Sequence, residues 1–96
     1  NRRLSPEARA RAPHLYQSLQ AAAALVRAGH ATAVAVQTVV RERLAAVPGL
    51  ALEYIAVADA DTLQPLAEPY AGRPVVLCLA AHLDGVRLID NVVVAV

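Results

Sequence analysis

Apolar residues recur at helical spacing in the first half of the chain. One stripe predicts a helix over residues 13–28 and consists of Leu15, Leu19, Ala22 and Val26. A second stripe predicts a helix over residues 31–47 and consists of Val36, Val40, Leu44 and Val47. Gly29 and Pro48-Gly49 are typical helix stops. Because the link between the two helices is very short, they are expected to pack as an antiparallel hairpin.

A shorter helix is predicted before this hairpin. Ser5-Pro6-Glu7 is typical of a helix start, since serine caps free N–H groups and proline suits the first helical position. Pro13 removes one backbone donor and clashes with the preceding turn. We therefore expect a separate short helix over residues 6–12.

The second half of the chain changes to strand patterns. Strands are predicted over residues 50–57, 75–83 and 86–94, and the middle one is apolar on both faces, as in a central strand. Asp84-Gly85 favours a two-residue hairpin turn, Asp59 to Thr62 a turn, and residues 63–74 a loop. The predicted fold class is α+β, with two layers: a helical hairpin followed by a three-stranded antiparallel sheet over residues 1–96.

Composition narrows the class of protein. With 96 residues the chain is long enough for one domain, and its core must use small aliphatic residues, because Phe, Trp and Met are absent. The lack of methionine predicts that the sequence begins inside a longer chain. A net charge of +1 predicts no nucleic-acid partner, and no apolar run approaches the ~20 residues that span a bilayer. The single cysteine fits a reducing cytoplasm.

Candidate chemistry is sparse. The histidines His14, His30 and His82 lack metal-ligand spacing, so we expect surface histidines and no metal site. Cys78 has no sulfur partner and is interpreted as a buried, inert strand cysteine; it would lie about 13 Å from His82 along a strand, too far to share a proton. Asp59 and Asp61 are interpreted as turn residues rather than an acid–base pair. Glycine-rich phosphate loops are absent.

Three polar residues lie in the last predicted strand. We interpret Arg87 and Asp90 as a structural ion pair, formed with each other or with another domain, and keep a ligand contact as the alternative. Asn91 is expected to be a structural hydrogen-bonding residue in the middle of the strand or at a bulge.

Three stretches carry a resemblance to a known family. They are Asn1 with Leu4-Ser5-Pro6-Glu7 and Arg9; Leu52-Glu53-Tyr54 with Asp59-Ala60-Asp61-Thr62-Leu63; and Ala80-Ala81 with Leu83 and Arg87-Leu88-Ile89-Asp90-Asn91. In order and spacing they resemble, over essentially the whole chain, the C-terminal domain of the pantothenate synthetases (pantoate–β-alanine ligases). The chain departs from the family pattern at Arg3, Ala8, His82 and Asp84, where the family has Tyr, Glu, Arg and Gly.

The resemblance implies a ligase of coenzyme A biosynthesis. The family joins pantoate to β-alanine with ATP and Mg²⁺ through a pantoyl adenylate, releasing AMP and pyrophosphate. Its N-terminal Rossmann-like domain holds the substrates, and its C-terminal domain covers them as a lid. Residues 1–96 would then be the lid, with their own N-terminal domain as partner, in an enzyme that is usually a homodimer. Alone, they are expected to be inactive and to hold no cofactor.

The resemblance also indicates a hinge. The family segment that contacts the ATP phosphates lies immediately before the position of Asn1, so Asn1 and Arg2 are the candidate cofactor-binding residues. We hypothesise that Arg2 and Arg3 tune closure by meeting anionic groups; the alternative is two solvated arginines. A second function class also stays open, a stand-alone α+β module for protein interaction or oligomerisation.

Overall fold

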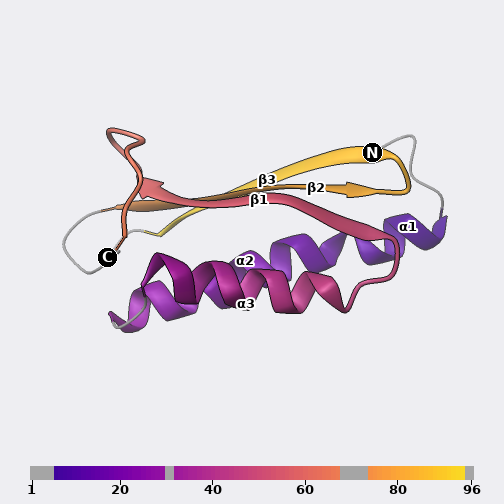
Figure 1. The fold of residues 1–96 in the computed structure, drawn as a ribbon, viewed down its shortest axis with the longest axis horizontal. Helices are drawn as coiled ribbons and strands as arrows, with labels where there is room; N and C mark the ends of the chain where they lie inside the picture. Colours follow the sequence, from indigo (N-terminus) through magenta and orange to yellow (C-terminus); the bar gives the residue numbers. More distant parts are fainter. Residues whose placement is uncertain (1–5, 30–31, 68–73, 95–96) are drawn as a thin grey trace.

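The computed structural model describes residues 6–29, 32–67 and 74–94. Its elements are the helices α1 (Pro6–Arg11), α2 (Pro13–Ala28) and α3 (Ala33–Ala45) and the strands β1 (Leu50–Asp59), β2 (Val75–Leu83) and β3 (Val86–Val94). The strands form one antiparallel sheet in the order β1-β2-β3, and the helices lie together on one side of it (Figure 1). The predicted two-layer α+β class is confirmed.

The helix ends follow from local chemistry. Pro13 opens α2, and Gly29 ends it in a left-handed conformation (φ 81°) with its N–H donating to the Val26 carbonyl at 3.0 Å. Helix α3 is shorter than predicted, because the Thr32 hydroxyl caps it by accepting from the Ala35 N–H at 3.1 Å. At its other end the helix stops at Ala45, before the buried Val47.

The core lies between the helices and the sheet. Helix α2 packs mainly beneath β3, and α3 beneath β1. Both predicted apolar stripes are buried there, together with Ser18, whose hydroxyl donates to the Leu15 carbonyl at 2.7 Å. The strands contribute Ile55, Val57, Val75, Leu77, Leu79, Ala81 and Val94. The core is aliphatic, as the composition requires.

Side chains of a strand alternate between two faces, so the other half of each strand points away from the helices. We call this second surface the open face. It consists of Ala51, Glu53, Tyr54, Ala56, Ala58, Val76, Cys78, Ala80, His82, Arg87, Ile89, Asn91 and Val93.

The turns between strands match the sequence. Asp84 (φ 51°) and Gly85 (φ 78°) form the predicted two-residue hairpin turn, which pairs Leu83 with Val86. The Asp59 carboxylate accepts from the backbone N–H groups of Asp61 at 2.8 Å and Thr62 at 3.0 Å, which confirms a turn there. The residues that follow return along β1, where the Leu66 N–H donates to the Val57 carbonyl at 3.0 Å.

Arg11 fixes α1 to the hairpin end of the sheet. Its guanidinium donates to the Pro48 carbonyl at 2.9 Å and pairs with the Asp84 carboxylate at 3.5 Å. The start of the described chain is thereby placed beside the β2–β3 turn. Across the described residues, no helix is both long and apolar enough to span a membrane.

Candidate functional site

A β-bulge at Glu53 builds the most polar cluster of the described residues. Leu52 pairs with Ala81 and Tyr54 pairs with Ala80, so Glu53 is an extra residue without a register partner in β2. The bulge resets the alternation of β1, which leaves Leu52 on the helix side and Tyr54 on the open face.

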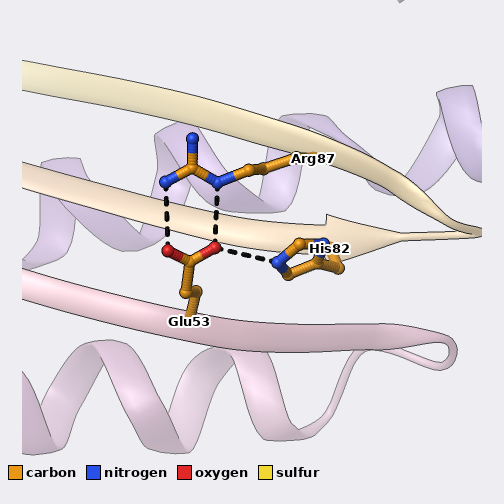
Figure 2. A network of polar contacts seen from close by, with 3 residues as sticks. All are labelled: Glu53, His82 and Arg87. Atoms are coloured by element: carbon orange, nitrogen blue, oxygen red, sulfur yellow. Dashed lines mark hydrogen bonds and ion pairs between the residues drawn. The ribbon is translucent and has the colours of Figure 1, made fainter.

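The Glu53 carboxylate binds side chains from both other strands, as Figure 2 shows. Arg87 of β3 donates from Nε to Oε1 at 2.9 Å and from a terminal nitrogen to Oε2 at 3.0 Å. The Nε2 atom of His82, on β2, lies 2.8 Å from Oε1. Because His82 and Arg87 are register partners, one carboxylate links all three strands at the hairpin end of the open face.

These contacts change the electrostatics of the carboxyl group. The hydrogen bonds from Arg87 and then from His82 lower the pKa of Glu53 from 4.5 to about 2. The same contact with Glu53 raises the pKa of Arg87. Such a carboxylate is ionised at neutral pH and is a poor general base, because an effective base has a pKa near the working pH. The cluster is therefore an electrostatic link between strands, and it places charge at one end of the open face.

Of the two predicted alternatives, an ion pair of Arg87 with Asp90 is wrong, and a pair with another domain stays a prediction. Positions three apart in a strand lie on opposite faces, so Arg87 lies on the open face and Asp90 on the helix side. Asp90 instead accepts from the Asn91 backbone N–H at 2.9 Å. The bulge is also not at Asn91, which pairs regularly with Cys78. The Glu53 partner was missed, although the apolar positions of β1 change phase between Leu52 and Ile55.

The other candidate residues are spread over the molecule. Cys78 is half-buried on the open face and not buried as predicted; the burial that it has raises the pKa of its thiol, in keeping with an unreactive strand cysteine. His14 is exposed on α2, whereas His30 lies outside the described residues. In the described ranges, no three His, Cys, Asp or Glu side chains converge as metal ligands. Asn1, Arg2 and Arg3 also lie outside the described residues.

The hollows among the described residues are shallow. One of about 190 Å³ lies at the outer edge of β3 and is lined by Arg87, Asp90 and apolar neighbours. Another, of about 480 Å³, lies between α3, β1 and the loop after β1. Among its described lining residues the polar side chain is Gln37, which is already bonded to the Ile55 carbonyl at 3.1 Å. Small-molecule sites instead combine an enclosing cavity with several convergent polar groups.

Known proteins are similar to this chain in sequence and in the arrangement of helices and strands. The family model for pantoate–β-alanine ligase matches residues 1–93. The chain belongs to the pantoate–β-alanine ligase family. A crystal structure of the pantothenate synthetase from Thermus thermophilus matches with a TM-score of 0.78 at 33% identity, covering 97% of this chain and 33% of that one. The fold is therefore one that the family already contains.

Relatives in this ligase family are much longer. A pantothenate synthetase of Moorella thermoacetica is 42% identical over 96 residues, which are all of this chain and 33% of that protein. One from Paracoccus denitrificans is 46% identical over 94 residues, 98% of this chain and 32% of that protein. The chain thus spans about a third of the length of the curated relatives that it matches.

Proposed function

We propose that this chain is the lid domain of an ATP-dependent pantoate–β-alanine ligase. The observation that carries the proposal is the family match over residues 1–93, with relatives about three times as long. In the proposed reaction the pantoate carboxylate attacks the α-phosphorus of ATP and pyrophosphate leaves. The amine of β-alanine then attacks the acyl carbon, AMP leaves, and the amine loses a proton.

The shallow hollows support a lid rather than a self-contained site. ATP, Mg²⁺ and both substrates would bind mainly to the part of the polypeptide outside this chain, since these hollows are open and the described residues form no metal cluster. A lid contributes by excluding water from the acyl adenylate, a mixed anhydride that water otherwise hydrolyses.

The activity is tested with the full-length polypeptide that carries this chain. Given pantoate, β-alanine, ATP and Mg²⁺, it should form pantothenate and AMP in equal amounts. A version without residues 1–96 should release AMP in excess of pantothenate, because exposed adenylate hydrolyses. No pantothenate from the full polypeptide would exclude the ligase activity. Equal products at the full rate from the shortened version would exclude the lid.

The hinge proposal for Asn1 and Arg2 has its own test in the full-length polypeptide. Replacing Arg2 and Arg3 together by alanine should raise KM for ATP, because two cations near the phosphate-binding segment would be lost. A paired change of Arg41 and Arg43, which are exposed on α3, is the control with the same loss of charge. Kinetics equal to the control would leave Arg2 and Arg3 as solvated side chains.

A further inference from the structure

The open face is mostly apolar, whereas a sheet face in contact with water is usually polar. Antiparallel sheets with one face in water typically alternate apolar residues inward with polar residues outward. Beyond the Glu53–His82–Arg87 cluster, however, the open face carries one polar residue, Asn91, among alanine, valine, isoleucine, tyrosine and cysteine. All described helices lie on the opposite side of the sheet (Figure 1).

Large apolar side chains on this face are accessible. Ile89 is 60% exposed, Val93 54% and Tyr54 38%. They lie in two rows of the sheet: one holds Tyr54, the buried Ala80 and Ile89, and the other pairs the buried Val76 with Val93. The row of Ala56, Cys78 and Asn91 lies between these two rows. Large accessible apolar side chains gathered on one face in this way mark an interaction site.

The size of the surface favours a tethered partner. Three strands ~4.8 Å apart and about nine residues long at ~3.3 Å per residue cover roughly 400 Å². Interfaces between domains of one chain bury about 600–1,500 Å² in total, which fits this surface on one side. A stable interface between separate chains needs about 800 Å² from each partner. A tethered domain also meets the surface at millimolar effective concentration, so it requires fewer contacts than a second copy.

The charged end of the face is also where the chain enters. Arg11 holds the end of α1 against Pro48 and Asp84 beside the hairpin. Helix α1, the first described element, therefore lies at the end of the sheet that carries Glu53, His82 and Arg87. Charged groups at the rim of an apolar surface exclude wrong partners and fix orientation.

We propose that the open face docks onto the part of the ligase polypeptide that lies outside this chain. The inference rests on the proposed function and deepens it, because it names the surface with which the lid meets its own catalytic part. The apolar rows supply the buried contact, and the Glu53–His82–Arg87 cluster forms its polar rim next to the hinge.

Val93 and Val34 provide a matched pair of variants for the full-length polypeptide. Val93→Glu places a charge on the open face, whereas Val34→Glu places the same charge on α3, where the side chain is 70% exposed. Alkylation of Cys78, followed by peptide mass spectrometry, reports whether the open face is covered. Small-angle scattering reports the domain arrangement, and thermal unfolding checks that both variants fold. Ile89→Glu, in another row, serves as a second variant if Val93→Glu fails to fold.

Val93→Glu should speed alkylation of Cys78 by about tenfold or more. Docking would bury the new carboxylate without a partner, and this costs more than the ~1.4 kcal/mol that corresponds to a tenfold change in the docking equilibrium. Val34→Glu should leave the rate within about twofold of the original, a difference of ~0.4 kcal/mol. A carboxylate near the thiol by itself raises the thiol pKa and slows alkylation, so a faster rate reports uncovering. The radius of gyration should also increase for Val93→Glu alone.

Two results would overturn the proposal. One is equal alkylation rates and scattering for both variants. The other is a dimer that Val93→Glu converts to monomers without changing the domain arrangement, which would make a second copy the occupant. Pantothenate formation, measured on the unmodified polypeptide, keeps the two proposals separate. An inactive polypeptide with a protected Cys78 removes only the ligase activity, and an active one with an unprotected Cys78 removes only the docking surface.

Discussion

Leu77 and Cys78 are neighbours in β2, yet they meet different surroundings. Leu77 faces the helices and is fully buried between its register partners Val57 and Val92. Cys78 points to the open face, lies between Ala56 and Asn91, and is half-buried. The same three strands thus build a packed core surface and an accessible surface from alternate residues.

The difference shows what holds each surface in place. On the helix side, aliphatic side chains of α2 and α3 complete the packing, so the hydrophobic effect dominates. On the open face, the polar side-chain contacts that link the strands within the described ranges are those of Glu53 with His82 and Arg87. Both surfaces consist mostly of apolar residues. The main difference between them is that the described helices cover only one.

The largest effect is expected for a substitution on the helix side of the sheet. Leu77→Ala should lower the free energy of unfolding by about 2–5 kcal/mol, because it removes buried methyl groups and leaves a cavity. In this chain on its own, without the proposed docking partner, Ile89→Ala is a similar truncation on the open face and should cost less than about 1 kcal/mol, since Ile89 is 60% exposed. Urea unfolding of the same polypeptide measures both values. Equal losses would mean that the open face is packed as tightly as the core.

The next effect concerns the β2–β3 turn, which sets the register and thereby the face on which each β3 residue lies. A slip of one residue in the β2–β3 register would exchange the two faces of β3. Gly85 has φ 78° and open space where a Cβ would lie, so Gly85→Ala adds backbone strain without a clash. We expect a loss of roughly 1–2 kcal/mol in the free energy of unfolding. Gly85→Asn is the control, because asparagine tolerates the left-handed region; a loss as large as that of alanine would contradict this explanation.

The elements were predictable because their signals are local. Helical spacing in α2, the stops at Pro13 and Gly29, and the Asp84-Gly85 turn each act within a few residues. The sequence therefore predicted α2, β2 and β3 with their observed bounds. Helix α3 ended earlier than predicted, and β1 ran on to Asp59, since caps and strand ends depend on neighbouring segments.

The polar cluster was not predictable in this way. Glu53 and Arg87 are 34 positions apart, and their contact depends on the register of two strand pairs and on the bulge. Arg87 and Asp90 looked like partners because they are close in sequence, although the strand sends them to opposite faces. The phase change between Leu52 and Ile55 was the one local signal of the bulge.

A pH series tests the ionic link on the open face. Because its pKa is lowered from 4.5 to about 2, Glu53 stabilises the folded state above about pH 4.5, and this contribution disappears as the pH falls toward 2. Glu53→Gln should therefore lower Tm at pH 7, and the difference from the original protein should vanish near pH 2. Glu42→Gln, on the exposed side of α3, is the matched control. A difference in Tm that is independent of pH would mean that the substitution acts through side-chain packing rather than through the charge of Glu53.

The smallest expected effect is that of Arg87→Lys. Lysine keeps the positive charge but presents no planar pair of donors, so the two-pronged contact with Glu53 becomes a single one. The pair is exposed to solvent, and salt screens such pairs. Tm should fall by less than for Glu53→Gln, and raising NaCl from about 0.05 M to about 0.5 M should remove most of the difference.

The salt dependence of stability therefore distinguishes contacts on the two faces of the sheet. The loss caused by Leu77→Ala should persist at high salt, because ions do not screen burial of apolar surface. If the Arg87→Lys difference also persisted, the contact with Glu53 would be held by packing of the arginine stem over the open face rather than by charge. The cluster would then belong to the apolar surface itself, and the proposed docking surface would lack its charged rim.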